Sequence, residues 1–309
     1  MIGCVCSSIA PGTTHTERYR EGLTEVNCYI DAGNSRIKAH LARRSQKTVE
    51  PVVIDWPAAN ESDPVGALAT RLEPLLVDEK GRSPKQVVLA SVVEPRRRDW
   101  LGTAIAEVCP QAECRWLEVP GKCCHVRVAY ESPADLGVDR FCAMIEARAC
   151  HPDRPLAVIN AGTAITLDVL AADGQHLGGL ILPGWRAQLQ ALRAAAPALA
   201  PAIESLEHAG EFAEPRDTAA PVPETTRRLG LAADTATAIE LGRHWLIAAG
   251  VNQMLSVWQE RLADEGPLLA VIAGGDADRL ADLIDPALEH CLEADLVLAG
   301  VVRLARARR

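Results

Sequence analysis

Apolar runs that end in a glycine turn occur once in each half of the chain. Residues 26–41 place an apolar run before Asp-Ala-Gly-Asn and further apolar positions after it, and residues 156–170 repeat this order around Asn-Ala-Gly-Thr. Each pattern predicts a strand, a tight turn and a returning strand. Because such a unit stands in both halves, we expect two duplicated halves that face each other across a cleft, a favoured place for a ligand.

The rest of the pattern predicts strands and helices in alternation. Residues 86–93 form a β-branched apolar run typical of a strand, and residues 115–131 carry one or two more. Apolar side chains recur at helical spacing over residues 136–150 and again after Gly184. Residues 196–228, rich in Ala and Pro, predict a loop or an irregular helical segment. This order indicates α/β sheets with mixed strand directions.

Two further elements are expected in the second half. A long helix runs from about Asp234 to Leu262, with an apolar stripe formed by Ile239, Trp245, Leu246, Ala249 and Leu255. The stripe is longer than one domain face needs, so we expect a homodimer built partly on this helix, although burial within its own domain would satisfy the same stripe. Residues 268–284 predict a strand, a Gly274-Gly275 turn and a helix, and this turn would let a nucleotide pass close to the backbone.

Composition narrows the class of protein. A length of 309 residues with 48% hydrophobic and 24% charged residues predicts a globular chain of two domains. The net charge of −9 argues against a general nucleic-acid binder. Ten scattered cysteines form no disulfide framework or zinc set, which favours a reduced, cytoplasmic protein. Residues 1–25 lack a signal-peptide pattern and are interpreted as an extension outside the fold, and no apolar run approaches the ~20 residues that span a membrane.

The two glycine turns carry side chains suited to phosphate chemistry. A tight glycine turn brings backbone N–H groups close to phosphate oxygens. Asp31 is suited to a hydrated Mg²⁺, and Asn34 and Thr163 add uncharged donors. Two ordinary hairpins with polar turn residues would explain either motif alone, and their matching positions favour function. The sequence contains neither a P-loop nor a G-x-G-x-x-G fingerprint after a strand.

Four stretches of the chain carry motifs in a fixed order. They are DAGNSRIK at 31–38, PADLGVDR at 133–140, INAGTAITLDV with HLGGLILPG over 159–184, and DTATAIELG at 234–242. The first three resemble the first phosphate motif, the L-G-[AV]-D-R motif and the second phosphate motif of the type III pantothenate kinases, also called Bvg accessory factor-like proteins. The fourth resembles a later helix segment of that family. Order and spacing agree from about residue 26 to the C-terminus.

The resemblance implies a duplicated RNase H-like α/β fold of the acetate and sugar kinase/Hsp70/actin superfamily, with residues 26–150 as the first half and 151–309 as the second. It also implies phosphorylation of pantothenate by ATP, the first step toward coenzyme A, with Mg²⁺, a monovalent cation (K⁺ or NH₄⁺) and a homodimer. The phosphates of ATP would be lined by Asp31, Ala32, Gly33, Asn34, Ser35, Arg36, Ile37, Lys38, Gly162 and Thr163. Pantothenate would contact Tyr130, Gly137, Val138, Asp139 and Arg140, and Thr235 would reach it across the dimer interface.

Asp139 is expected to be the general base of this reaction. A primary alcohol is a poor nucleophile, so a carboxylate within hydrogen-bond reach can accept its proton as the bond to phosphorus forms. Near a helix N-terminus Asp139 should stay ionised at neutral pH, and Arg140 suits the substrate's carboxylate or orients Asp139. Each residue also has a structural alternative: a helix-dipole partner for Asp139, a surface ion pair for Arg140, a core-edge residue for Tyr130 and a solvated strand end for Lys38.

The chain departs from the family pattern at Asn160. The second phosphate motif usually begins there with an Asp that serves a monovalent cation, and an amide keeps an acceptor oxygen but loses the charge. We therefore expect weakened cation binding. Two other functions stay open: a non-catalytic nucleotide-binding accessory protein, and a kinase of the same superfamily for another small alcohol. The retained Asp31 and Asp139 favour the kinase.

Overall fold

The computed structural model describes residues 27–42, 51–58, 60–77, 81–208 and 230–307. The predicted extension, residues 1–25, lies outside the described residues, as does the part of the 196–228 segment from 209 onward. Where that segment is described, it forms a helix, α5 (Ala200–His208).

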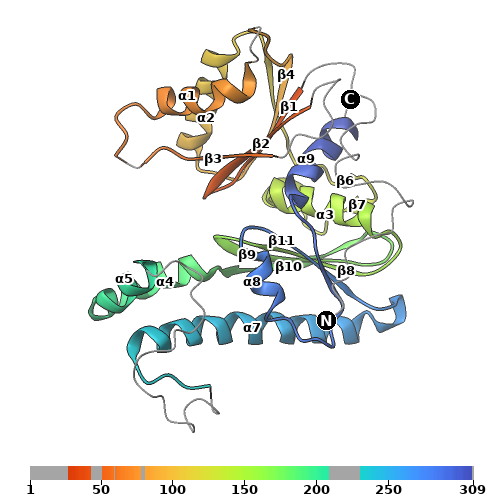
Figure 1. The fold of residues 1–309 in the computed structure, drawn as a ribbon. Helices are drawn as coiled ribbons and strands as arrows, with labels where there is room; N and C mark the ends of the chain where they lie inside the picture. The colour runs from red at the N-terminus through yellow and green to blue at the C-terminus, as the bar shows by residue number, and fades with distance from the viewer. Residues whose placement is uncertain (1–26, 43–50, 59, 78–80, 209–229, 308–309) are drawn as a thin grey trace.

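Two five-stranded sheets of identical design form the frame of the molecule (Figure 1). The first has the order β3-β2-β1-β4-β5, with β1 (Asn27–Ala32), β2 (Arg36–Ala42), β3 (Val52–Asp55), β4 (Gln86–Ser91) and β5 (Glu113–Trp116). The second has the order β10-β9-β8-β11-β12, with β8 (Leu156–Ala161), β9 (Ala164–Leu170), β10 (His176–Pro183), β11 (Leu269–Ala273) and β12 (His290–Leu292).

Strand directions also repeat. In each sheet the first strand pairs antiparallel with the second and parallel with the fourth, the second pairs antiparallel with the third, and the fourth pairs parallel with the fifth. The predicted duplicated α/β fold is therefore confirmed.

Two helices lie between the sheets. The helices α3 (Val138–Cys150) and α9 (Leu296–Ala307) pack against each other, and both sheets contribute to the core around them (Figure 1). Tyr29 and Val88 of the first sheet and Val158 and Val271 of the second belong to this shared core. The C-terminal helix α9 thus packs against the first sheet, although it follows the second along the chain. The division at residues 150 and 151 stays a prediction.

The outer face of each sheet is covered by its own helices. The first sheet carries α1 (Pro64–Leu76) and α2 (Pro95–Val108), and the second carries α4 (Trp185–Ala195), α7 (Thr235–Arg261) and α8 (Ala277–Ala281). The remaining elements are β6 (Lys122–Cys123), β7 (Val126–Arg127) and the 3₁₀ turns Pro133–Asp135, Pro197–Leu199 and Ala263–Glu265. No helix within the described ranges is both long enough and apolar enough to cross a membrane.

The stripe predicted for the long helix is wrong in its middle part. The buried residues of α7 are Ile239, Arg243, Ile247, Val251 and Leu255, which follow one another at intervals of four residues. This interval keeps Ile247, Val251 and Leu255 in the core on the outer face of the second sheet, whereas Ile239 packs with Leu189 and Ile203 of α4 and α5. Trp245 and Leu246 lie off that face and are 64% and 65% exposed, and Ala249, the third predicted member that is wrong, is exposed as well.

Candidate active site

The first phosphate turn connects β1 to β2. Asp31 lies near the end of β1 opposite Lys38 on β2, and the Gly33 N–H donates to the Arg36 carbonyl to close the turn at 3.1 Å. Ala32 and Ile37 are buried in the core between the first sheet and the helices α1 and α2. The residues at the tip of the turn, Asn34, Ser35 and Arg36, are exposed. Because Gly33 donates within the turn, we expect the exposed tip to supply the donors for a phosphate.

Two side chains from elsewhere hold this turn in place. Trp56 donates from its indole N–H to the Gly33 carbonyl at 2.8 Å, and Arg97, in the first turn of α2, donates to the Asn34 carbonyl at 2.7 Å. The Arg97 guanidinium also lies over the Trp56 ring, 5.2 Å from its centroid. The carbonyls of Gly33 and Asn34 are thereby held toward the protein.

The second turn repeats the first between β8 and β9. Asn160 lies at the position that Asp31 has on β1, and the Gly162 N–H donates to the Ala164 carbonyl at 3.1 Å. The hydroxyl of Thr163 makes a hydrogen bond with the hydroxyl of Ser35. The tips of the two turns therefore meet, as the duplicated hairpins predicted.

The Gly274-Gly275 turn follows β11. Gly274 has a φ of 107°, and a Cβ there would overlap the backbone of Ala161. This glycine is thus required by the close approach of two strand ends. A Cβ at Gly275 would meet nothing within 4 Å. The predicted close approach of a nucleotide to this turn therefore concerns Gly275, whereas Gly274 is explained by the packing of the strands.

Asp139 lies in the first turn of α3. Its Oδ1 accepts a hydrogen bond from the Arg140 backbone N–H at 2.8 Å. Gly137 lies just before it, and a Cβ there would lie 2.5 Å from that same oxygen, so a larger residue would displace the Asp139 carboxylate. Burial raises the pKa of Asp139, while the Arg140 N–H and guanidinium act to lower it.

The carboxylates at the site repel one another. Burial and the charges of Asp139 and Asp295 raise the pKa of Asp31 to about 7, although Lys38 acts in the opposite direction. Lys38 is itself paired with Asp295, its Nζ lying 2.7 Å from Oδ1. Asp295 immediately precedes α9 and has a left-handed φ of 53°. A site with this excess of negative charge is suited to a cation.

The donor set at Asp31 fits Mg²⁺ carried by a nucleotide. Among the described residues there is no group of three or more His, Cys, Asp or Glu side chains that would hold a metal by themselves. Mg²⁺ commonly takes one or two carboxylates and completes its shell with phosphates and water. Asp31 would be that carboxylate.

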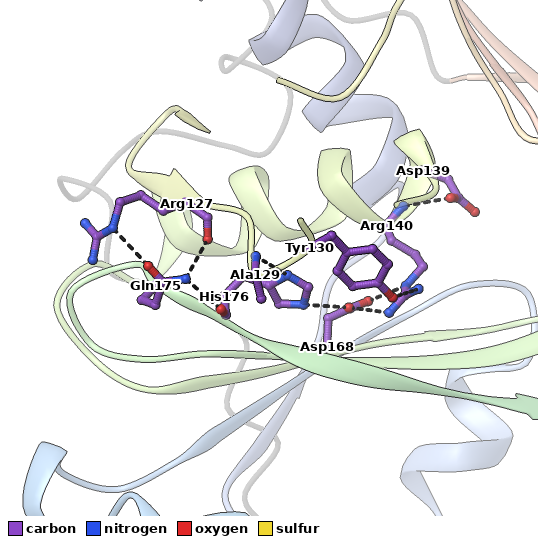
Figure 2. A network of polar contacts seen from close by, with 8 residues as sticks. All are labelled: Arg127, Ala129, Tyr130, Asp139, Arg140, Asp168, Gln175 and His176. Atoms are coloured by element: carbon purple, nitrogen blue, oxygen red, sulfur yellow. Dashed lines mark hydrogen bonds and ion pairs between the residues drawn. The ribbon is translucent and has the colours of Figure 1, made fainter. Parts of the chain in front are cut away.

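Tyr130 and Arg140 belong to a network of polar contacts beneath the start of α3 (Figure 2). Arg140 donates from Nε and Nη2 to the two oxygens of Asp168, at 2.9 and 2.6 Å, and from Nη1 to the Tyr130 hydroxyl at 3.2 Å. His176 lies 3.0 Å from Asp168 and stacks on the Tyr130 ring. The Arg140 ion pair is therefore buried rather than superficial.

A family model described as type III pantothenate kinase matches residues 28–257. The chain belongs to the type III pantothenate kinase family. Proteins named type III pantothenate kinase from Burkholderia multivorans and Burkholderia vietnamiensis are 31% and 33% identical to it over 286 residues, which are 92% of this chain and 97% of each relative. The protein of that name from Aromatoleum aromaticum is 33% identical over 277 residues, 90% of this chain and 96% of the relative. Among solved structures, an acetate kinase from Porphyromonas gingivalis is 13% identical with a TM-score of 0.47, over 92% of this chain and all of that one.

Thr235 lies apart from the other predicted family positions. It is exposed at the start of α7, whose N-terminus is capped by Asp234 through a 2.9 Å bond from the Thr237 N–H. The helix α7 packs on the outer face of the second sheet, whereas α3 packs on the inner face (Figure 1). Near Thr235 the helix α7 packs against α4 and α5, where Ile239 shares a core cluster with Leu189 and Ile203.

Five contributors to the site were not predicted from the sequence: Trp56, Arg97, Asp168, His176 and Asp295. Only Asp168 had a visible signal. In the strand sequence ITLDVL, Ile165, Leu167 and Val169 face the outer core, so the intervening Asp168 places a charge on the inner face. A charge at an inward position requires a partner, and Arg140 is that partner.

Proposed function

We propose that this chain transfers the γ-phosphoryl group of ATP to the primary hydroxyl of pantothenate, giving 4′-phosphopantothenate and ADP. The observation that carries the proposal is the arrangement of Asp139 at the start of α3, between two sheets whose glycine turns meet at Ser35 and Thr163. Family membership supplies the donor and the acceptor.

The two turns would hold the phosphates of ATP. The exposed tip of the first turn and Thr163 of the second present donors from opposite sides, as a phosphate chain between two sheets requires. Lys38 would add a positive charge once a phosphate competes with Asp295 for it. Mg²⁺ bound at Asp31 would neutralise the charge that develops during transfer.

Asp139 would act as the general base. The hydroxyl of pantothenate attacks the γ-phosphorus, its proton passes to a carboxylate oxygen of Asp139, and ADP leaves with the electrons of the broken P–O bond. One Asp139 oxygen is fixed by the Arg140 N–H, which orients the carboxylate. Tyr130, Gly137, Val138 and Arg140 would line the acceptor site.

The assembly is proposed to be a homodimer, and the protein is expected in the cytoplasm. The strand β10 is the edge of the second sheet and exposes three large apolar side chains, Leu177, Leu180 and Ile181. Trp245 and Leu246 of α7 are also exposed. Apolar edge strands are pairing surfaces, and a partner chain would bring its own Thr235 to the acceptor site.

An ADP-release assay tests the function. Purified protein is incubated with ATP, Mg²⁺ and a panel of small alcohols, and ADP release is expected with pantothenate. Asp139→Asn keeps the shape of the side chain, so it should lower kcat by about 10²–10⁴-fold without unfolding the protein.

Two results would overturn parts of the proposal. Turnover of a folded Asp139→Asn protein at the wild-type rate would remove Asp139 as the base. Absence of ADP release with every alcohol would favour a non-catalytic accessory protein, and release with an alcohol other than pantothenate would reassign the acceptor.

A further inference from the structure

A closed ring of four side chains connects the two halves of the molecule beneath α3 (Figure 2). Arg140 pairs with Asp168 of β9 through both oxygens, and Asp168 contacts His176 of β10. His176 stacks on Tyr130, with ring centroids 5.9 Å apart and planes at 16°, and the Tyr130 hydroxyl accepts from Arg140. Two members lie at predicted acceptor-binding positions, and the other two have no role in the proposed reaction.

The ring is built within the protein interior. Arg140, Asp168 and His176 are 6%, 2% and 0% exposed. An ion pair removed from water is stable only when its geometry is good and its remaining hydrogen-bond positions are satisfied. Asp168 meets this requirement, because it accepts from two Arg140 nitrogens and from His176.

The backbone of Ala129 fixes the protonation of His176. The Ala129 N–H donates to His176 Nδ1 at 3.4 Å, so Nδ1 is an acceptor and carries no proton. The proton is therefore on Nε2 and is donated to Asp168 Oδ1. The charge of Arg140 balances that of Asp168 in the buried pair.

The strand β10 is shaped to accommodate the ring. Its register against β9 shifts between His176 and Gly178, and Gly178 has a φ of 119°. Such a bulge redirects the neighbouring side chains. A Cβ at Gly179 would lie 2.4 Å from the Leu167 carbonyl oxygen, 2.5 Å from Asp168 Oδ1 and 2.6 Å from Arg140 Nη2, so glycine leaves room for both the β9 backbone and the ion pair.

A second set of contacts ties the segment bearing Tyr130 to the same strand (Figure 2). Arg127 of β7 donates from Nε to the Gln175 side chain at 3.1 Å, and Gln175 donates to the His176 carbonyl at 2.8 Å. Arg140 thus holds the Tyr130 hydroxyl and His176 stacks on the Tyr130 ring. Gln175 holds the preceding backbone segment through its contact with Arg127.

We propose that Asp168 and His176 are positioning residues that fix Tyr130 and Arg140 for the acceptor substrate; this rests on the function proposed above. Arg140 lies in the first turn of α3, and its backbone N–H donates to the Asp139 carboxylate. By holding Arg140, the ring therefore also holds the carboxylate of the proposed base in its orientation. The Arg140 charge is already balanced by Asp168. Arg140 therefore orients the acceptor site and does not offer an unpaired charge to the substrate.

Two substitutions at His176 separate its hydrogen bond from its stacking. His176→Phe keeps an aromatic ring beside Tyr130 but leaves Asp168 without its third donor. His176→Gln keeps a donor for Asp168 but loses the ring. With the full-length protein, we expect His176→Phe to raise the KM for pantothenate by about tenfold or more, with the KM for ATP changed less than about twofold. His176→Gln should restore part of the loss.

The control is His125→Asn, since His125 lies in the β6–β7 turn with a left-handed φ of 62°, a conformation that Asn tolerates. It should leave both KM values unchanged. Asp168→Asn is the second variant: it keeps the side-chain shape but leaves the Arg140 charge without its counter-ion, and it should raise the KM for pantothenate and lower kcat. Thermal unfolding identifies a variant that fails to fold.

The outcomes are distinct from those of the proposed function. Wild-type turnover of pantothenate together with an unchanged pantothenate KM in folded His176→Phe and Asp168→Asn would overturn the positioning roles alone. Equal increases in both KM values would show a structural role only and would also overturn them. If the wild type uses another alcohol, the same KM comparison is made with that alcohol, and inactivity with every alcohol overturns both proposals.

Discussion

Asp31 lies in an environment unlike that of an ordinary surface carboxylate. Its pKa of about 7 lies above the value of about 3.9 in an unfolded chain. Between these pH values the folded protein binds a proton that the unfolded chain has already released, so the free energy of unfolding decreases as the pH rises from about 4 to 7. Above pH 7 the full cost of the buried charge is present.

Asp31→Asn should therefore stabilise the protein while it removes the proposed magnesium ligand. An amide carries no charge, so the gain in free energy of unfolding should be small near pH 4 and reach about 1–4 kcal/mol near pH 8. Denaturant unfolding at the two pH values measures it, with Asp264→Asn at an exposed position as the control. A gain of equal size at both pH values would contradict the assigned cause.

Asn160 should make this protein insensitive to potassium. The amide stands at the end of β8 where a carboxylate would attract a cation, and loss of one full charge lowers the occupancy of a weak oxygen site. At matched ionic strength, activity should be nearly equal in sodium and potassium buffers. Asn160→Asp should introduce activation by potassium. A large, saturable activation of the wild type by potassium, absent with sodium, would show that Asn160 is no obstacle to the cation and would contradict this prediction.

Local chemistry determined what could be predicted about single residues. The turns at Gly33 and Gly162 and the helix start at Asp139 follow from sequence neighbours, and all three lie where the patterns indicated. Trp56 and Arg97 act on a turn that is 23 and 63 residues away along the chain. A contact over such a separation depends on the sheet order and leaves no mark in a single sequence.

At the scale of elements, the existence of strands and helices was predictable, but the face of a long helix was not. The predicted stripe on α7 combined three exposed residues, Trp245, Leu246 and Ala249, with the buried Ile239 and Leu255. In a helix of 27 residues with apolar side chains on several faces, periodicity does not determine which face meets the sheet. The buried face includes Arg243, which donates to the Trp185 carbonyl at 2.7 Å. Because a charged residue occupies one position of the buried face, the apolar residues alone do not reveal that face in the sequence.

The contact between α3 and α9 depends on one glycine. A Cβ at Gly300 would overlap the backbone of Cys142, so the two helices approach more closely than any side chain permits. In a helix interior Gly→Ala ordinarily stabilises by up to about 1 kcal/mol. Gly300→Ala should instead destabilise the protein by about 1–3 kcal/mol, because it forces α9 away from α3. Denaturant unfolding measures the change.

Gly250→Ala in α7 is the matched control for this substitution. A Cβ at Gly250 would meet nothing within 4 Å, so the ordinary helix preference should prevail and stability should increase. If Gly300→Ala stabilised the protein as Gly250→Ala does, the close contact between α3 and α9 would not depend on glycine at position 300.

At the scale of the whole molecule, the proposed acceptor site requires two chains. If Thr235 acts across the dimer interface, Asp139→Asn and Thr235→Ala inactivate the same site from different subunits. After the two inactive proteins are mixed and exchange subunits, half of the dimers should be mixed, and each mixed dimer has one intact site. Activity should return to about one quarter of the wild-type value, because one of four sites is intact.

Two results would contradict this arrangement. If the mixture stays inactive although subunit exchange is demonstrated with labelled chains, Thr235 acts within its own chain, whereas a Thr235→Ala protein that is active before mixing would show that Thr235 has no role. Light scattering that shows a fully active monomer at micromolar concentration would exclude the shared site. The exposed Trp245 and Leu246 would then require another explanation.

The position of α9 has a consequence for synthesis of the chain. Tyr29, Val88 and Ala90 lie on the inner face of the first sheet and share a core with α9. Roughly 200 residues separate the end of β4 from the start of α9. At about 5–20 residues per second, a ribosome needs on the order of 10–40 s to supply them. During this interval the inner face of the nascent first sheet lacks its last helix. The uncovered apolar face is then accessible to a chaperone or a protease.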